Sequence, residues 1–440
     1  MKISIAGTGY VGLVTAVCLA SKGHQVTCVD IDAEKIAMLK SGRSPIYEPG
    51  LEELMKQYAQ NLRYTTNAEE GYRDAEVVFI GVGTPEKRDG SANLSYVFKV
   101  AETIANSIEN DCIIVIKSTV PVGTNDRIEE YITKNLKNKI QISVASNPEF
   151  LSQGSAVHDT LYASRIILGV ESDDVEKKLR KVYENFDSPI LVTNRRSAEM
   201  IKYASNDFLA LKISYINEVA NLCEEVGADI EAVTAGMGYD YRIGKNFLNA
   251  GIGYGGSCFP KDTKALNWLG NLHDKEIKTI KAAIEVNEQQ KLRLYKKSRR
   301  YYDSLKSLTV AVLGVTFKPE TDDLREAPSL VNVPMFLEEG AYVKLWDPIG
   351  IKKFKSIIEN INCEGIEHLI YCKSIEDTIK DADICFIFTE WKQIKNIDPQ
   401  QFILMKKPII LDGRNCFSLE KMEGHPLVYD SIGRRRISGI

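Results

Sequence analysis

The sequence predicts an α/β protein in which a helical central domain joins two doubly wound, Rossmann-like domains. Short apolar runs rich in β-branched residues recur near both ends of the chain, and helix-like segments separate most of them. Runs of this kind are typical of parallel strands that helices cover on both faces. Between the two sets, the strand-like runs disappear and helical periodicity takes their place. We therefore expect two parallel sheets, one at each end of the chain.

The two sets of runs resemble each other in order and spacing. They lie at residues 2–7, 24–30, 73–80 and 113–119, and again at residues 308–314, 341–347, 380–387 and 408–414. Chance similarity among buried strands is the alternative explanation. In the central section, helical periodicity marks residues 198–227 and 277–302, and a glycine-rich stretch at 251–256 interrupts it. These limits predict domains at residues 1–196, 197–300 and 301–440.

Length and composition restrict the function classes. A chain of 440 residues suits two or three domains. Its 44% hydrophobic and 26% charged residues are those of a soluble globular protein. The net charge of −4 and the lack of basic runs, apart from a triplet at 434–436, give no reason to expect a nucleic-acid partner. We expect that triplet to be a solvated tail.

The cysteines and the first residues bear on the compartment. Nine cysteines without a C-x-x-C pair fit a reducing compartment, and none of the five histidines pairs with cysteine at zinc-ligand spacing, so we expect no metal. The uncharged stretch at 3–21 imitates a secretory signal, but its three glycines are unlike a continuous signal helix. Since no later segment is long and apolar enough to span a membrane, we expect a cytoplasmic protein.

A dinucleotide-binding fingerprint lies at the start of the chain. Gly7, Gly9 and Gly12 form a G-x-G-x-x-G pattern that follows an apolar strand and opens a helix, and the next strand ends in Asp30. Such glycines let the backbone approach a pyrophosphate, and the acid accepts hydrogen bonds from the adenosine ribose. A carboxylate there repels a 2′-phosphate, which favours NAD over NADP. FAD, or a tight turn without a ligand, are the alternatives. The C-terminal α/β domain keeps only Gly314, so we expect no second dinucleotide there.

The glycine-rich stretch delivers a cysteine to the expected start of a helix. There Cys258 would meet the positive end of the helix dipole and Lys261, and both favour the thiolate. Asp262 follows four residues later, on the same helical face. A buried, inert cysteine is the alternative. The sequence thus offers Cys258 as a nucleophile.

Three further constellations carry polar side chains. Lys202 and Asn206 are four residues apart on one expected helix, a spacing that is more often found on a solvated surface. Glu149 lies in a polar turn after an expected strand, and Thr119 lies at the C-terminal end of another. The C-terminal ends of parallel strands are where α/β folds place their ligands.

Together these motifs resemble the UDP-glucose/GDP-mannose dehydrogenase family over nearly the whole chain. The matching positions are 7–12, 84–85, 117–123, 147–151, 202 with 206, 242–244, 255–262, 317–318 with 325–326, and 412–414. The string Gly-Gly-Ser-Cys-Phe-Pro-Lys-Asp at 255–262 is the most specific of them. The resemblance implies an NAD-dependent, four-electron oxidation of UDP-glucose to UDP-glucuronate through a cysteine thiohemiacetal and thioester, followed by hydrolysis. It also implies a homodimer or larger assembly.

The resemblance further implies roles for individual residues. Cys258 is the nucleophile, Lys202 stabilises the oxyanion and alkoxide, Asn206 orients the sugar oxygen, Asp262 and Thr119 hold water, and Glu149 is the candidate general base for hydrolysis. The positions that match NAD contacts are Gly7, Gly9, Val11, Gly12, Asp30, Lys35, Thr84, Thr119, Lys261 and Arg325. The positions that match nucleotide-sugar contacts are Glu149, Phe150, Leu151, Lys202, Asn206, Phe247, Gly255, Lys318 and Arg414, with Arg242 supplied by a neighbouring subunit.

One departure and several alternatives remain at this point. Gln153 stands where the family commonly has Glu, so hydrolysis would depend more on Glu149 and Asp262. GDP-mannose is the alternative substrate, and Phe259 is the one residue that favours the UDP-glucose branch. A two-electron hydroxyacid dehydrogenase would share the first domain and a helical second one, but it would need neither Cys258 nor a third domain. A non-catalytic NAD sensor would not need the nucleophile loop.

Overall fold

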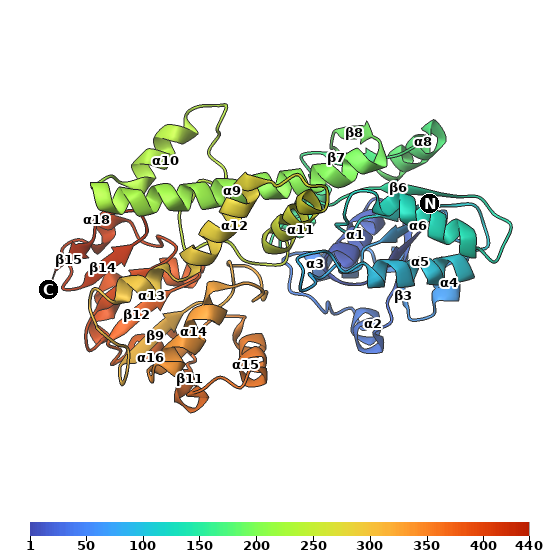
Figure 1. Ribbon diagram of the computed structural model, residues 1–440. Helices are drawn as coiled ribbons and strands as arrows, with labels where there is room; N and C mark the ends of the chain where they lie inside the picture. The colour runs from blue at the N-terminus through green and yellow to red at the C-terminus, as the bar shows by residue number, and fades with distance from the viewer. Residues whose placement is uncertain (440) are drawn as a thin grey trace. The chain divides into compact units, whose positions relative to one another are not determined.

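The strands lie in two separate sheets in the computed structural model, which describes residues 1–439 (Figure 1). The chain divides into two units, each with one sheet. The first unit comprises Met1–Ser205 and Trp268–Asp274, and the second comprises the other described residues. The predicted fold class, with two doubly wound sheets, is confirmed. The predicted limits of three domains stay a prediction.

The sheet of the first unit has the order β3-β2-β1-β4-β5-β6-β7-β8. Its strands are β1 (Lys2–Ala6), β2 (Gln25–Val29), β3 (Leu62–Thr65), β4 (Val77–Ile80), β5 (Cys112–Ile116), β6 (Ile142–Ser146), β7 (Ile166–Gly169) and β8 (Ile190–Thr193). All neighbours are parallel except β6 and β7. The order of the first six strands is that of a dinucleotide-binding fold.

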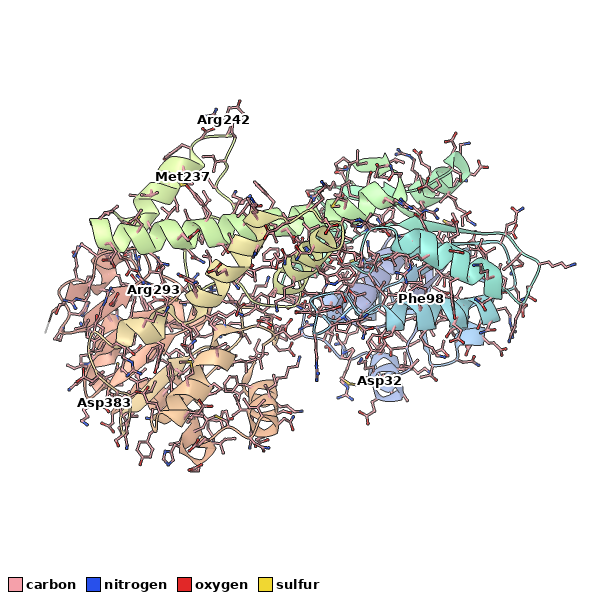
Figure 2. The ribbon with its side chains drawn as sticks, viewed as in Figure 1. Asp32, Phe98, Met237, Arg242, Arg293 and Asp383 are labelled. Carbon is pink, nitrogen blue, oxygen red and sulfur yellow. The ribbon has the colours of Figure 1, made fainter. Side chains whose placement is uncertain are left out.

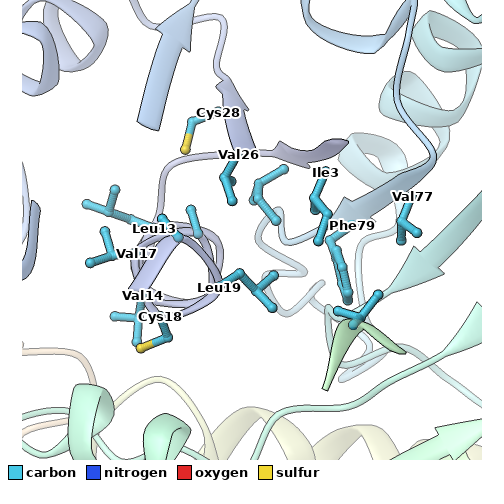
Figure 3. Close-up of a cluster of buried hydrophobic side chains, with 14 of the residues drawn as sticks. Ile3, Leu13, Val14, Val17, Cys18, Leu19, Val26, Cys28, Val77 and Phe79 are labelled. Carbon is cyan, nitrogen blue, oxygen red and sulfur yellow. The ribbon is translucent and has the colours of Figure 1, made fainter. Parts of the chain in front are cut away.

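Helices cover both faces of this sheet because its strands are apolar on both sides. The helices are α1 (Tyr10–Ser21), α2 (Ala33–Lys40), α3 (Leu51–Gln57), α4 (Ala68–Tyr72), α5 (Ser95–Ser107), α6 (Thr124–Asn135), α7 (Ala156–Leu161) and α8 (Asp173–Val182). On β4, Phe79 packs in the cluster that holds α1, whereas Ile80 packs in the cluster that holds α5 and α6. Figure 3 shows the first of these clusters, with Phe79 and Ile3 beside the α1 residues Leu13 and Val17. This packing holds the start of α1 at the end of β1.

The sheet of the second unit repeats the same strand order. It runs β11-β10-β9-β12-β13-β14-β15, so its first six strands correspond in order to those of the first sheet. Only the edge pair β14 and β15 is antiparallel. The strands are β9 (Thr309–Leu313), β10 (Tyr342–Trp346), β11 (Leu369–Tyr371), β12 (Ile384–Ile387), β13 (Ile409–Asp412), β14 (Val428–Ser431) and β15 (Ile437–Ser438). All eight predicted runs contain strands, and the similarity between the two sets reflects a repeated topology.

Short helices flank this second sheet. They are α14 (Pro328–Glu338), α15 (Ile351–Asn360), α16 (Ile375–Ile379), α17 (Lys392–Lys395) and α18 (Leu419–Met422). The buried residues Phe336 of α14 and Phe354 of α15 pack on one face, and Ile379 of α16 and Ile394 of α17 pack on the other. The second sheet is therefore doubly wound as well.

Only helices lie between β8 and β9 in the described chain, as predicted. They are α9 (Arg195–Val226), α10 (Ile230–Gly238), α11 (Phe259–Leu272), α12 (Lys278–Lys291) and α13 (Arg293–Ser298). The C-terminal half of α9 buries Ile216 and Ala220 in the core of the second unit. The stretch predicted as one helix at 277–302 is divided at Leu292 into α12 and α13. Within residues 1–439, no helix has the length and apolar character needed to cross a membrane.

Arg435 and Arg436 are exposed, as the sequence predicts for the basic triplet at 434–436, but Arg434 is buried. Arg434 is only 2% exposed, and its guanidinium donates hydrogen bonds to Glu231 Oε1 at 2.8 Å and to the Phe417 carbonyl at 3.0 Å. A buried arginine is stable when its donors are paired in this way. Arg434 therefore fixes the C-terminal strands to α10, and the prediction was wrong for this residue.

Candidate active site

The turn between β1 and α1 fits a dinucleotide pyrophosphate. Gly7 has a φ of +93°, a conformation that favours glycine. A Cβ on Gly12 would lie 2.0 Å from the Gly7 carbonyl oxygen, so only glycine allows the helix to start so close to the strand. A Cβ on Gly9 would meet nothing within 4 Å, which leaves open space above the helix N-terminus. Open space at the N-terminus of a helix suits a phosphate.

Asp30 follows β2 at the same end of the sheet, where the fingerprint requires an acid. Its Oδ2 accepts hydrogen bonds from the Thr8 backbone N–H at 2.7 Å and from the Thr8 hydroxyl at 2.6 Å. Burial raises the pKa of Asp30, but these hydrogen bonds outweigh it and hold the pKa below its usual value. The residue is therefore a carboxylate at neutral pH, as ribose recognition needs.

The other predicted cofactor positions lie in the same unit or in the second one. Val11 belongs to the first turn of α1, and Lys35 of α2 lies 3.6 Å from Asp32. Thr84, after β4, donates its hydroxyl to the Thr119 carbonyl at 2.8 Å, which joins the ends of β4 and β5. Lys261 and Arg325 belong to the second unit.

A buried ion pair joins Lys202 and Glu149. Lys202 Nζ lies 2.9 Å from Glu149 Oε1, and the two side chains are only 3% and 6% exposed. The other carboxylate oxygen of Glu149 accepts the Leu151 backbone N–H at 2.8 Å. The ring of Phe150 lies under the ammonium of Lys202, 5.4 Å from its centroid. The four-residue spacing of Lys202 and Asn206 is more often found on a solvated surface. In the structure, however, Lys202 is buried, and its ammonium contacts Glu149 in the turn after β6.

Lys117 is a second buried lysine beside this pair, and no sequence motif assigned it a role. Its Nζ donates to Asn147 Oδ1 at 3.0 Å, and that oxygen also accepts the hydroxyl of Tyr183. Burial lowers the pKa of Lys117 to about 8, Glu149 opposes this shift and Lys202 adds to it. The signals in the sequence were its position at the C-terminal end of a strand and its place in the matching stretch 117–123. The first unit thus places two lysines around one carboxylate.

Gln153 lies in the turn before α7 and is 9% exposed. Glu48 orders this turn, because its carboxylate accepts the backbone N–H groups of Gly154 and Ala156, both at 2.7 Å. Glu48 also accepts the hydroxyl of Tyr10, the first residue of α1. Glu48 therefore couples the fingerprint turn to the Glu149 turn, and it was not predicted.

The cysteine loop of the second unit depends on its glycines. A Cβ on Gly255 would lie 2.6 Å from the Glu326 carbonyl oxygen, and one on Gly256, whose φ is +83°, would lie 2.7 Å from the Phe317 ring. The Gly256 N–H donates to the Arg325 carbonyl at 2.7 Å. These close approaches to the segment after β9 exclude larger side chains. The run of glycines therefore has a steric cause.

Amide side chains from α9 and α12 hold the backbone of the same loop. Asn217 accepts the Gly251 N–H at 2.8 Å, and Gln290 donates to the Gly251 carbonyl at 2.7 Å. Asn287 bonds both the N–H and the carbonyl of Tyr254, at 2.7 and 3.0 Å. Arg414, after β13, donates to the Gly253 carbonyl at 3.0 Å. A loop with its polar groups satisfied in this way is pre-organised.

Cys258 immediately precedes α11, as predicted. It is partly exposed, and its carbonyl accepts the Asp262 N–H at 2.8 Å in the first turn. Asp262 is fully buried and accepts hydrogen bonds from Asn206 Nδ2 at 2.7 Å and from Lys261 Nζ at 2.5 Å. Burial lowers the pKa of Arg325, but the carboxylate of Asp323, 2.6 Å away, outweighs it and the charge of Cys258 adds to the rise, so the pKa lies above its usual value. The positive surroundings and the helix N-terminus favour a Cys258 thiolate.

The remaining predicted positions also lie in the second unit. Lys318 follows β9, with its ammonium 5.7 Å from the Phe317 ring centroid. Phe247 has a φ of 62° and packs edge-on against Phe259 at 6.1 Å. Arg242 lies on the loop after α10, labelled in Figure 2, and pairs with Asp240 at 2.6 Å. No group of three or more potential metal ligands occurs among residues 1–439.

Comparison with known proteins agrees with this geometry. Three models of the UDP-glucose/GDP-mannose dehydrogenase family match the chain: the NAD binding domain at residues 1–187, the central domain at 196–289 and the UDP binding domain at 311–419. The Bacillus subtilis UDP-glucose 6-dehydrogenases YwqF and TuaD are 46% and 44% identical to the chain. These alignments cover 99% and 100% of this chain and 98% and 94% of the relatives.

Solved structures give the same result. A UDP-glucose dehydrogenase from Pyrobaculum islandicum is 35% identical, with a TM-score of 0.91, over 99% of this chain and 98% of that one. A UDP-D-ManNAc dehydrogenase from Pyrococcus horikoshii is 26% identical, with a TM-score of 0.86, over 99% of both chains. The predicted family and the predicted NAD cofactor are confirmed. The chain belongs to the UDP-glucose/GDP-mannose dehydrogenase family, and it is an NAD-dependent nucleotide-sugar dehydrogenase.

Proposed function

We propose that this enzyme oxidises C6 of UDP-glucose twice and releases UDP-glucuronate. The observation that carries the proposal is Cys258 at the N-terminus of α11, in a loop that glycines and amide side chains fix. Relatives that are 41–46% identical along nearly the whole chain are UDP-glucose 6-dehydrogenases, which supports UDP-glucose over GDP-mannose. A two-electron hydroxyacid dehydrogenase forms no covalent thiol intermediate and therefore does not need such a cysteine loop.

The first unit supplies the groups that handle charge on the sugar oxygen. NAD, when bound, accepts one hydride in each of the two oxidations. The Gly7–Gly12 turn and Asp30 would hold its pyrophosphate and ribose, with Lys35 and Thr84 as further contacts. Lys202 would stabilise the alkoxide that forms when the alcohol loses its proton. Its buried ion pair with Glu149 keeps its ammonium in one place before substrate binds.

The second unit supplies the nucleophile. The Cys258 thiolate adds to the aldehyde carbon, a C–S bond forms, and the oxygen takes up a proton to give a thiohemiacetal. Loss of a hydride from that carbon and of a proton from its hydroxyl group then leaves a thioester. Because the aldehyde stays covalently attached, it cannot diffuse away between the two oxidations. Asn206, Lys261 and Arg325 would orient the sugar oxygen and the cofactor.

Hydrolysis returns the cysteine to its starting state. Glu149 would take a proton from water, the oxygen would attack the thioester carbon, and the C–S bond would break to release carboxylate and Cys258. Thr119 and Asp262 would hold water. The residues that would contact the nucleotide-sugar are Phe150, Leu151, Phe247, Gly255, Lys318 and Arg414. Of these, Phe150, Lys318 and Arg414 follow the C-terminal ends of β6, β9 and β13, where such folds bind ligands.

Product stoichiometry tests this function. Purified enzyme with excess NAD and limiting UDP-glucose is expected to form two NADH for each sugar, with no free aldehyde, because the aldehyde stays on Cys258. NADH absorbance and trapping of aldehydes with a hydrazine reagent measure both quantities. The control is GDP-mannose at the same concentration. One NADH per sugar with released aldehyde would refute the covalent route, and faster turnover of GDP-mannose would refute the substrate.

We also propose a homodimer built on α9. Phe208, Tyr215 and Leu222 repeat every seven residues on this helix and are 61%, 53% and 60% exposed. Seven-residue spacing puts them on one face, and apolar faces of this kind mark interaction surfaces. Tyr241, on the loop that carries Arg242, is 92% exposed. A second copy of the chain would cover these side chains and receive Arg242.

Light scattering and subunit complementation test the assembly. We expect a dimer at micromolar concentration, and Tyr215→Glu is expected to give a monomer because a charge would be buried in the interface. Ile403→Glu, at an apolar residue that is 73% exposed on the same unit, is the matched control. If Arg242 acts on the partner, mixing inactive Arg242→Ala and Cys258→Ser subunits should restore about a quarter of the active sites. A fully active Tyr215→Glu monomer would contradict the proposal.

A further inference from the structure

Asp207 is a buried carboxyl group that the reaction proposed above does not use. It follows Asn206 on α9 and is only 1% exposed. Neither of its side-chain oxygens has a hydrogen-bond partner among the described residues. A buried carboxylate without a partner is strongly unfavourable, so a carboxyl group in this position keeps its proton to higher pH than usual.

The charged surroundings of Asp207 come from the nucleophile segment. Burial, and after it the negative charge of Asp262, raises the pKa of Asp207 to about 8, and Lys261 opposes this shift. Asp207 also acts on Tyr254 in the glycine loop. Burial, and after it the charge of Asp207, raises the pKa of Tyr254 to about 12. The charged groups that act on Asp207 are therefore Asp262 and Lys261 of α11, and Asp207 in turn acts on Tyr254 of the loop.

Asp262 connects Asp207 to Cys258. The neighbour of Asp207, Asn206, donates to Asp262 Oδ2 at 2.7 Å, and Lys261 donates to Asp262 Oδ1 at 2.5 Å. The Asp262 N–H donates to the Cys258 carbonyl at 2.8 Å, so the carboxylate lies one helical turn after the cysteine. As long as Asp207 is neutral, Lys261 balances the single charge of Asp262.

We propose that Asp207 is a positioning residue that makes the reactivity of Cys258 depend on pH through Asp262. When Asp207 releases its proton to solvent, this cluster gains a second negative charge beside Asp262. That charge opposes formation of the Cys258 thiolate and competes with Asp262 for Lys261. The enzyme would then lose activity in mildly alkaline solution, although more thiolate would otherwise form there. The proposal rests on the nucleophilic role of Cys258 proposed above.

Alkylation of Cys258 tests this effect without substrate. The rate of Cys258 modification by iodoacetamide, followed by peptide mass spectrometry, is measured from about pH 6 to about pH 10 in the wild type and in Asp207→Asn. Asn keeps the size of the side chain but has no proton to lose. We expect the variant to react about threefold to tenfold faster than the wild type above pH 8, since raising the pKa of a thiol by about one unit lowers its thiolate fraction by up to about tenfold. The two rates should be equal near pH 6.

A matched control variant and a second measurement keep the result interpretable. Asp303→Asn changes an exposed carboxylate of the same unit and should follow the wild type at every pH. The melting temperature reports whether Asp207 carries its proton. A carboxyl group whose pKa is raised in the folded protein binds a proton more tightly there than in the unfolded chain. The folded state therefore loses stability as the pH rises from the unfolded pKa of the group toward 8. The melting temperature of Asp207→Asn should therefore exceed that of the wild type at pH 8 and approach it near pH 5.

The outcomes separate this role from the proposed function. Identical alkylation curves for Asp207→Asn and the wild type would overturn the proposal, and so would a difference in melting temperature that does not change with pH. If both readouts behave as expected but the enzyme does not oxidise UDP-glucose, Asp207 still controls Cys258 and the substrate is wrong. A pH–rate profile of UDP-glucose oxidation whose alkaline fall disappears in Asp207→Asn would support both.

Discussion

Replacing Cys258 with serine is expected to lower steady-state formation of UDP-glucuronate by roughly 10³-fold or more. The hydroxyl keeps the shape of a nucleophile, but it ionises far less readily than a thiol beside the N-terminus of α11, and an alkoxide is a poorer leaving group than a thiolate. The first oxidation should survive in part. Any ester that forms should hydrolyse slowly and leave the sugar bound to the enzyme.

Intact-protein mass spectrometry during turnover checks this result. The serine variant should carry a sugar-nucleotide adduct that persists after NAD is exhausted. Cys372→Ser, at a partly exposed cysteine of the second unit that lies outside the site, should behave like the wild type. If Cys258→Ser retained wild-type turnover, Cys258 would not be the nucleophile.

The strands that fall within the eight predicted runs could be recognised because their signal is local. Runs such as residues 77–80 and 384–387 are fully buried and consist of apolar residues, so composition alone identifies them. The strand β8 could not be found in this way, because Leu191 is 51% exposed and the strand lies at the sheet edge. The three-residue strand β11 lies at the other edge of its sheet and gives an equally weak pattern.

The environments of the polar residues were harder to predict, because they depend on distant parts of the chain. Cys258 was found since its glycines and its helix start are adjacent to it in sequence. Lys117 gains its environment from Asn147, which lies 30 residues later in the chain, and Asn147 in turn is bonded by Tyr183, another 36 residues later. Arg434 was assigned to a solvated tail because Glu231, 203 residues earlier, covers it only after folding. Burial of a charged residue is decided by such distant contacts.

Glu149 is the residue whose replacement should separate oxidation from hydrolysis. In Glu149→Gln the size of the side chain is kept, and its single amide oxygen can still accept one of the two hydrogen bonds that separate carboxylate oxygens accept in the wild type, from Lys202 or from the Leu151 N–H. The amide cannot take a proton from water. We therefore expect both hydride transfers to proceed and thioester hydrolysis to slow by roughly 10²–10⁴-fold.

Rapid mixing of Glu149→Gln with NAD and UDP-glucose should give a burst of two NADH per active site, followed by slow turnover, with the thioester visible on Cys258 by mass spectrometry. Glu149→Asp is the matched variant, because it keeps the negative charge next to Lys202 and Lys117 while withdrawing the carboxylate. It distinguishes loss of the base from loss of the ion pair, whose breakage leaves two buried lysines without a counter-charge. If neither a burst nor an adduct appears in Glu149→Gln although its melting temperature matches the wild type, Glu149 acts before hydrolysis. The base would then be sought at Asp262, whose carboxyl oxygens accept hydrogen bonds from Asn206 and Lys261.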